Sequence, residues 1–287
     1  AEEISAADWA LTFDLGINDP TTVLIERIIS DLKEKEKSYN LNDIIFAIRT
    51  DKRAEKKEKD LAENLFAAAK TWGIFSENGT EISKLLEPGK TTILDLSPYS
   101  SLGSYNVRAL VISLVSRKLF EERMFYRKIE EVESVRHGLE YLQYRQQREL
   151  PLVWIMIDEA HEFLPREGKT AATDALIQLL REGRQPGISL VLATQQPGEI
   201  HRDVITQADI VISHRVTAKP DIEALNKMMQ SYLLEDINAY LNQLPNLKGS
   251  AIILDDNSER IYPCRIRPKL TWHGGEAPTA VRIRRRI

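Results

Sequence analysis

The stretch that most constrains the fold is residues 152–164, which read Leu-Val-Trp-Ile-Met-Ile-Asp-Glu-Ala-His-Glu-Phe-Leu. An apolar run from Leu152 to Ile157 leads directly into two adjacent acids, Asp158 and Glu159. A short unbroken apolar run is typical of a strand buried on both faces, the kind found in parallel sheets. Open α/β sheets bind their ligands at the carboxyl ends of such strands. The stretch therefore predicts an α/β fold with two carboxylates at a ligand site.

The two acids have the pattern of a Walker B strand end. In such a site the aspartate holds Mg²⁺, and a neighbouring acid polarises the water that attacks the γ-phosphate of ATP. The pattern makes Asp158 a candidate magnesium residue and Glu159 a candidate catalytic acid. The alternative is a buried strand whose acids only cap the following helix, and the other motifs of the chain bear on this choice.

Composition supports a globular protein and excludes several classes. Of the 287 residues, 43% are hydrophobic, which is enough for the core of one large domain or two. The formal net charge of -4 argues against a generally basic nucleic-acid-binding protein. Residues 281–287 nevertheless hold four arginines, which suggests nucleic acid, an acidic partner surface or a solvated tail.

The single cysteine and the absence of long apolar runs indicate the compartment. One cysteine, Cys264, rules out an internal disulfide and fits a reducing environment, and we expect it to be a core thiol. No apolar run is long enough to cross a membrane. We therefore expect a cytoplasmic protein without a membrane partner.

The pattern of the chain changes near residue 88. Residues 1–88 are predicted to form a helical subdomain or insertion without catalytic residues, with helices at 20–37, from a cap at Asn42 or Asp43 to Ile48, and at 56–72. In the last of these helices Leu61, Leu65 and Ala68 share one face. From residue 91 strands and helices alternate, which predicts a mostly parallel sheet in residues 89–287. The expected strands are 91–97, 152–157, 188–193, 208–213 and 249–254, with 261–266 as a hairpin edge.

The long stretch 104–149 is predicted to be helical, with a break at His137-Gly138. Its second half is rich in Arg, Glu and Gln, so it is expected to be exposed or to cover a partner. It would connect the strand at 91–97 to the strand at 152–157 as a βαβ unit.

The segment Pro88-Gly-Lys-Thr-Thr92 invites comparison with a phosphate-binding P-loop. That loop has the pattern G-x-x-x-x-G-K-[ST] and leads into a helix. Here the position five before Gly89 is Lys84, and a strand is expected to follow. We interpret this Gly-Lys as a turn.

Polar residues gather after three successive predicted strands, as Asp158-Glu159, Thr194-Gln195 and Ser213-His214-Arg215. Such a cluster is a stronger indication of a site than any one member. The amide of Gln195 both donates and accepts hydrogen bonds, which suits a residue that positions water or senses a γ-phosphate. A glutamine that only satisfies backbone groups of its turn is the alternative.

Arg181 and Arg184 flank Gly183 in the loop before the strand at 188–193, at the end opposite the acids. From there they are expected to reach a neighbouring subunit, where an arginine stabilises the charge of phosphoryl transfer. Head-to-tail contacts of this kind make rings. The alternative is a solvated pair at a helix end, where cations suit the helix dipole.

Three of these motifs together resemble the HerA branch of the HerA/FtsK DNA-pumping ATPases. They are Ile-Asp-Glu-Ala-His-Glu-Phe at 157–163, Arg-Glu-Gly-Arg-x-x-Gly at 181–187 and Leu-Val-Leu-Ala-Thr-Gln-Gln-Pro at 190–197. The segments 88–97 and Trp-His-Gly-Gly at 272–275 are similar as well, so the resemblance covers roughly residues 85–275.

The resemblance implies a RecA-like P-loop ATPase core with ATP and Mg²⁺ as cofactors, a hexameric ring and double-stranded DNA threaded through it. Asp158 would be the magnesium residue, Glu159 the catalytic acid and Gln195, next to Thr194 at the nucleotide, the polar sensor. Arg184 would be the arginine finger, with Arg181 and Arg215 as weaker candidates. The resemblance also suggests a NurA-type nuclease as partner in DNA-end processing.

The chain departs from this family in one respect. The family carries its P-loop and a small β-barrel ahead of the helical insertion, and neither occurs in these 287 residues. We therefore expect a C-terminal part of a longer protein that by itself binds ATP weakly and does not hydrolyse it. A non-catalytic scaffold subunit and a conjugation- or secretion-type ATPase of the same superfamily remain the alternatives.

Two other enzyme classes share part of the spelling. Asp158-Glu-Ala-His161 spells the DEAH box of another helicase class, but the later motifs of that class are absent. A zinc protease is excluded because Pro165 stands where H-E-x-x-H needs its second histidine. We expect His161 to orient the loop of the two acids.

Overall fold

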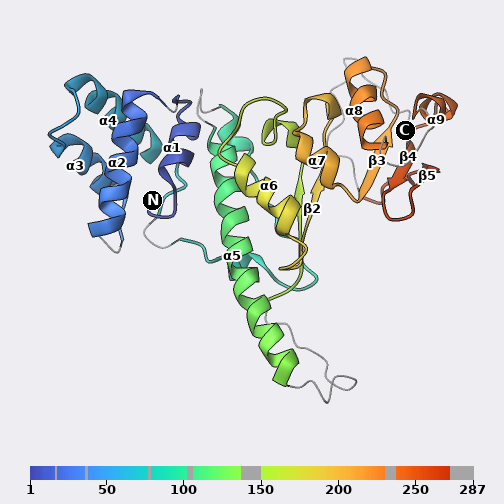
Figure 1. The fold of residues 1–287 in the computed structure, drawn as a ribbon, viewed down its shortest axis with the longest axis horizontal. Helices are drawn as coiled ribbons and strands as arrows, with labels where there is room; N and C mark the ends of the chain where they lie inside the picture. Colours follow the sequence, from blue (N-terminus) through green and yellow to red (C-terminus); the bar gives the residue numbers. More distant parts are fainter. Residues whose placement is uncertain are drawn as a thin grey trace, which may run out of the picture. The chain divides into compact units, whose positions relative to one another are not determined.

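The computed structural model describes residues 1–16, 18–35, 38–76, 79–101, 106–136, 150–229 and 237–271. The chain divides into two compact units, Ala1–Gln207 and Ala208–Ile287, which are described one at a time. Figure 1 shows the helices and strands of both units. The predicted domain boundary at residue 88 lies inside the first unit and stays a prediction.

The described residues of the amino-terminal region form four α-helices, one more than the sequence predicts. They are α1 (Ala6–Thr12), α2 (Pro20–Lys35), α3 (Leu41–Thr50) and α4 (Lys56–Lys70). The predicted cap of α3, Asn42 or Asp43, is wrong, because Asn40 is the N-cap. Its side-chain oxygen accepts from the backbone N–H of Asn42 at 2.7 Å, while Asp43 accepts from the N–H of Asn40 at 2.8 Å. This reciprocal capping box fixes where α3 begins.

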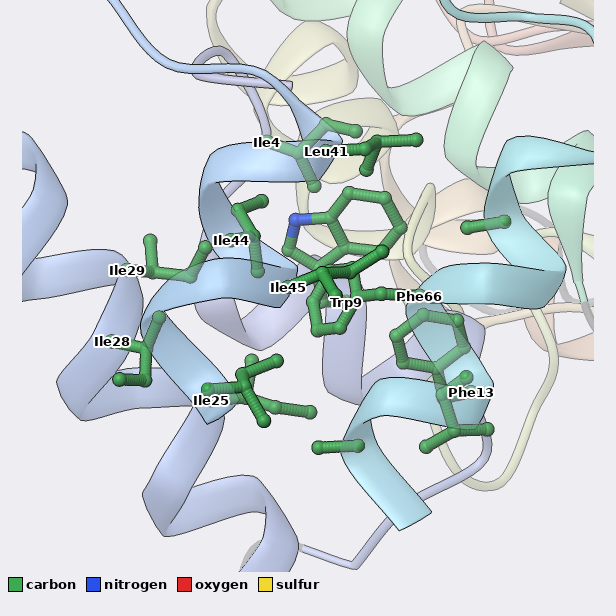
Figure 2. Close-up of a cluster of buried hydrophobic side chains, with 14 of the residues drawn as sticks. Ile4, Trp9, Phe13, Ile25, Ile28, Ile29, Leu41, Ile44, Ile45 and Phe66 are labelled. Atoms are coloured by element: carbon green, nitrogen blue, oxygen red, sulfur yellow. The ribbon is translucent and has the colours of Figure 1, made fainter. Parts of the chain in front are cut away.

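The helical region closes around its own apolar core, with Trp9 at the centre (Figure 2). The Trp9 ring is fully buried and packs against Phe13 and Phe66, with ring centroids 5.3 and 4.9 Å away. The buried face of α4 is shifted from the predicted one, since Leu61 is 42% exposed. The face that packs inward comprises Ala62, Leu65, Phe66 and Ala69.

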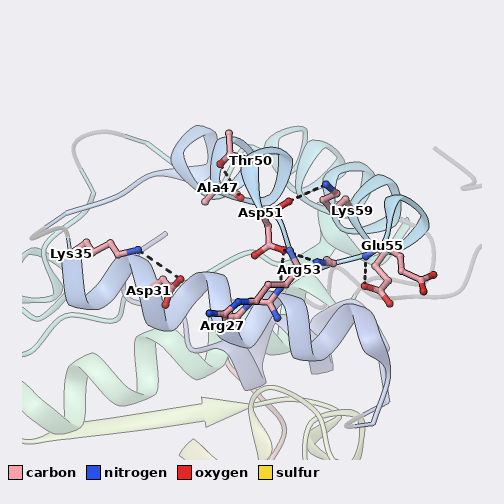
Figure 3. Close-up of polar contacts among 11 residues, drawn as sticks. Arg27, Asp31, Lys35, Ala47, Thr50, Asp51, Arg53, Glu55 and Lys59 are labelled. Atoms are coloured by element: carbon pink, nitrogen blue, oxygen red, sulfur yellow. Dashed lines mark hydrogen bonds and ion pairs between the residues drawn. The ribbon is translucent and has the colours of Figure 1, made fainter.

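The turn between α3 and α4 is organised by one carboxylate, that of Asp51 (Figure 3). It accepts from the N–H groups of Arg53 and Ala54, each at 2.8 Å, and pairs with Arg27 at 2.9 Å. Burial raises the pKa of Asp51, but the two N–H groups and the Arg27 guanidinium outweigh it and hold the pKa below its ordinary value.

The helix α5 (Val107–Arg136) joins the two hydrophobic cores of the first unit. Val107 and Leu110 pack into the core of the helical region, and Ala109 and Leu119 into the core around the parallel strands. The predicted helical break lies outside the described residues, and the predicted βαβ unit is wrong in its first strand. Residues 91–96 pair with no strand, and Ile93 is 83% exposed.

The predicted parallel strands are present as β1 (Val153–Ile157) and β2 (Ile188–Leu192), with α6 (Thr173–Glu182) between them in the chain. They pair in parallel from Val153↔Ile188 to Ile157↔Leu192. One face packs on the core through Ile155 and Leu190. The expectation that β1 is buried on both faces is wrong, since Trp154 and Met156 are 66% and 72% exposed on the other face.

The helix α7 (Arg202–Gln207) ends the first unit, and a three-stranded antiparallel sheet forms the second. Its order is β3 (Ile210–His214), β4 (Ser250–Asp255) and β5 (Arg260–Arg265). Apolar residues of α8 (Lys219–Met229) and α9 (Ile237–Gln243) pack against it.

The predicted hairpin of β4 and β5 is confirmed. The strand β3 runs antiparallel to β4, so the predicted parallel arrangement holds for β1 and β2 and not for this sheet. Cys264 is half-buried on β5. The Trp-His-Gly-Gly segment and the arginine tail lie outside the described residues. Among the helices that the structure describes, none combines the length and the apolar character that a membrane crossing requires.

Candidate functional site

The two strand ends that carry the predicted site residues lie side by side. The ladder of β1 and β2 continues beyond both strands, with Ala193 N–H donating to the Ile157 carbonyl and Ala160 N–H donating to the Ala193 carbonyl, each at 2.9 Å. These bonds hold the Asp158-Glu159 turn against the Thr194-Gln195 turn. The structure thus brings four predicted site residues to one edge of the strand pair.

Glu159 has an unusual backbone and an engaged side chain. Its φ and ψ of 48° and 46° are left-handed, a conformation that costs a non-glycine residue about 1–3 kcal/mol. Its Oε1 accepts a hydrogen bond from Gln195 Nε2 at 2.5 Å, a contact between residues 36 apart in the chain. Its Oε2 is buried and accepts no hydrogen bond from the described residues. The carboxylate is therefore held by Gln195 through Oε1, while the buried Oε2 faces His161.

His161 connects the two turns through its Nδ1 atom, which lies 2.9 Å from Thr194 Oγ1 and 3.5 Å from Glu159 Oε2. Thr194 Oγ1 also accepts from the backbone N–H of Gln196 at 3.0 Å. His161 is the middle residue of the short 3₁₀ turn η3 (Ala160–Glu162). Its expected role in orienting the loop of the two acids stays a prediction, and its contact with Thr194 depends on tertiary structure.

Asp158 is exposed at the end of β1, and its Oδ1 accepts from the Glu159 N–H at 3.0 Å. Its Oδ2 has no hydrogen-bond partner in the part of the chain that the structure describes. No group of three or more metal-ligating side chains occurs among those residues. A single free carboxylate oxygen still fits Mg²⁺, which takes most of its ligands from water and substrate phosphates.

The two arginines of the 181–187 loop differ in their surroundings. Arg181 pairs with Asp203 at 2.5 Å. Arg184 is exposed, and its side chain has no partner among the described residues. Both precede β2, whereas Gln195 follows it, and about 20 Å of extended chain separates Gly187 from Ala193. The structure therefore does not bring Arg184 to the acids of its own chain.

Arg215 belongs to the second unit, where it follows β3 and is exposed. The neighbouring His214 places Nδ1 3.0 Å from the Ser250 carbonyl, so it serves the sheet of that unit. The site described above consists of first-unit residues alone.

The fold and the site define a class: a mixed α/β protein with paired acids at the carboxyl end of a parallel strand. Residues 117–229 match the family model described as zonular occludens toxin (Zot). The DNA double-strand break repair helicase HerA of Pyrococcus furiosus is 25% identical over 180 residues, which cover 59% of this chain and 31% of that protein. A probable HerA of Methanocaldococcus jannaschii is 31% identical over 85 residues, 30% of this chain and 17% of that protein.

Among solved structures, the genome packaging NTPase B204 from Sulfolobus turreted icosahedral virus 2 in complex with sulfate has a TM-score of 0.43 at 18% identity. The structural match covers 69% of this chain and 76% of the B204 chain. The two sequence relatives confirm the resemblance of this chain to the HerA branch of the HerA/FtsK ATPases. The matches span less than a third of each HerA protein.

Proposed function

We propose that this chain supplies the Walker B and sensor part of an ATP-driven double-stranded DNA translocase or helicase that works as a hexameric ring. The observation that carries the proposal is the contact of Glu159 with Gln195, beside the free carboxylate oxygen of Asp158. This set matches the acids and the polar sensor that the resemblance implies.

Each residue of the site has a role in this proposal. Asp158 holds Mg²⁺, which neutralises charge on the β- and γ-phosphates when bound. Glu159 takes the proton of the attacking water. Gln195 holds Oε1, and its amide is placed to contact a γ-phosphate as well. His161 and Thr194 keep the two turns in register.

Arg184 acts in a neighbouring subunit as an arginine finger. Its distance from the acids of its own chain excludes a role in cis, and its exposed side chain is available to another copy. Arg181 is the weaker candidate because it is paired with Asp203. Arg215 stays a candidate on sequence grounds alone. A site that is completed in trans is the reason to expect a closed ring.

The DNA contacts are proposed to be sequence-independent and made to phosphates, so that binding weakens steeply with salt. The P. furiosus relative is a DNA double-strand break repair helicase, which supports a role in DNA-end processing. A cytoplasmic location and a NurA-type nuclease partner belong to the proposal on the sequence resemblance alone. No residues of this chain are assigned to the DNA.

The 287 residues contain no G-x-x-x-x-G-K-[ST] motif, so they lack the backbone cradle and lysine that hold phosphates. This chain alone is therefore expected to bind ATP weakly and to show no hydrolysis. The same observation favours a second candidate function, a non-catalytic scaffold subunit of the same fold.

An ATPase assay on the protein from its complete reading frame, with and without duplex DNA, separates the two candidates. DNA-stimulated hydrolysis that Glu159→Gln lowers at least about 100-fold supports the translocase. The control is Glu162→Gln, which changes a carboxylate that pairs with Arg108 instead. A protein inactive in both conditions favours the scaffold. Hydrolysis by the 287-residue chain that Glu159→Gln abolishes contradicts the need for a P-loop.

A further inference from the structure

The helix α5 contains a completely buried arginine, Arg123, with 0% exposure. Its Nε donates to the Pro186 carbonyl at 2.8 Å, and one terminal nitrogen donates to the Leu150 carbonyl at 2.8 Å. The same nitrogen pairs with Glu130 at 3.3 Å. Arginine is almost never fully buried unless it is paired, so these contacts must be specific.

The two carbonyls that Arg123 binds lie just before the two parallel strands. Leu150 precedes β1, and Pro186 precedes β2 at the end of the loop that carries Arg184. One guanidinium therefore ties α5 to the amino ends of both strands. The partners lie 27 and 63 residues away in the chain, so the contacts depend on the tertiary fold.

The 183–187 loop, which carries Arg184, is closely packed at both of its ends. A Cβ on Gly187, whose φ is +79°, would lie 2.3 Å from Leu152 Cδ2 and 3.6 Å from an Arg123 nitrogen. A Cβ on Gly183 would lie 2.4 Å from the Leu179 carbonyl oxygen. The backbone on both sides of Arg184 is thus held by close packing, while its side chain is exposed.

We propose that Arg123 is a positioning residue that fixes the 183–187 loop and so sets where Arg184 meets the neighbouring subunit. The inference rests on the proposed role of Arg184 in trans. Arg123 touches no reacting group, and its effect passes through the Pro186 carbonyl. Because misplacing a charged group by about 1 Å is enough to cost roughly 100-fold in rate, such an anchor matters to a finger that works across an interface.

The first test measures the anchor without ATP, by hydrogen exchange on the 287-residue chain carrying Arg123→Lys. Lysine keeps a charge for Glu130 but cannot donate from two separate nitrogens. We expect exchange at least about 10-fold faster at Gly187, Ile188 and Val153, whose N–H groups bond within or onto the loop. Arg127→Lys is the matched control, because Arg127 pairs with the same Glu130 but is half-exposed, and among the described residues it makes no ion pair with the loop. Unchanged exchange in Arg123→Lys overturns the inference.

The second test uses the protein from its complete reading frame. Arg123→Lys is expected to lower kcat about 10- to 100-fold with the KM for ATP nearly unchanged, and to cause no further loss when added to Arg184→Ala. Gly187→Ala disturbs the loop from its other side with Arg123 in place, and it is expected to lower kcat in the same way should Arg123→Lys fail to fold.

The possible outcomes distinguish the positioning role of Arg123 from the proposed ATPase function. Losses that add fully in the double variant overturn the positioning role while leaving the ATPase intact. A wild-type protein without ATPase activity overturns the proposed function and the catalytic meaning of the anchor with it, whatever the exchange rates show.

Discussion

Trp9 and Trp154 are the same kind of side chain in two regions with opposite surroundings. Trp9 is 0% exposed in the helical region, where four aromatic rings surround it. Trp154 is 66% exposed on β1, beside Met156 at 72%. In the helical region the helices enclose Trp9 in an apolar core, whereas the described residues cover only one face of the strand pair.

The helical region and the site region are stabilised by different interactions. The helical region depends on an apolar core and on capped helix ends. The site region depends more on directed polar contacts: the ladder between the strands, the Glu159–Gln195 bond and the buried Arg123. Substitutions that remove apolar area should therefore damage the first region most, and substitutions that disturb backbone placement should damage the second.

The largest loss of stability is expected for Trp9→Ala. It removes the central ring of the core and leaves a cavity, which costs about 3–5 kcal/mol. Thermal melting followed by circular dichroism of the 287-residue chain measures it. A shift no larger than that of an exposed-surface substitution would contradict the self-contained core.

Gly183→Ala is expected to come next, at about 1–3 kcal/mol, because the added Cβ would press on the backbone oxygens of Leu179 and Ile188 at 2.4 and 2.8 Å. Gly79→Ala is the matched control, since nothing lies within 4 Å of its added Cβ. The same melting experiment compares the pair. Equal stability of the two variants would show that the turn before β2 relaxes freely.

Asp51→Asn is expected to cost about 1 kcal/mol at neutral pH, because the carboxylate caps two N–H groups and pairs with Arg27. The folded-state pKa of Asp51 is lowered, so the stabilisation is complete above its ordinary value of 3.8 and is lost as the pH falls through the lower folded value. Melting curves of the wild type and the variant should therefore converge in acid. Asp31→Asn is the control, since its pair with Lys35 is exposed at 3.8 Å.

The smallest effect is expected for Trp154→Ser, within about 0.5 kcal/mol, because the side chain is already largely in water. A loss approaching that of Trp9→Ala would mean that this face is covered in solution. Sedimentation of the wild type at several concentrations would then identify a second copy as the cover.

Local patterns predicted the parts of the fold that local chemistry determines. The apolar run into Asp158-Glu159 and the run at 188–193 became the parallel pair, and the helices at 20–35 and 56–70 follow their apolar spacing. The predictions from local patterns were wrong where pairing with another segment determines the structure. Residues 91–96 have the composition of a strand but pair with no strand among the described residues. The strand β3 pairs with β4 in the antiparallel direction.

The site shows the same division. The sequence indicated Asp158, Glu159 and Gln195, but not that Glu159 and Gln195 are hydrogen-bonded across 36 residues. It did not indicate Arg123, because charged residues are usually solvated. Arg123 is buried because two carbonyls from distant segments and the carboxylate of Glu130 meet at one point, which no local pattern encodes.

The left-handed backbone of Glu159 lowers the stability of this turn, whereas the carboxylate of the same residue is needed for the proposed chemistry. Glycine and asparagine adopt that conformation at lower cost than glutamate. Glu159→Gly and Glu159→Asn would therefore relieve the turn while removing the acid, so selection for thermal stability alone would favour variants without it. Directed evolution of this chain for heat resistance is expected to replace Glu159 early unless activity is selected at the same time. Glu159→Gln is the substitution that changes the charge while leaving the backbone preference nearly as it is.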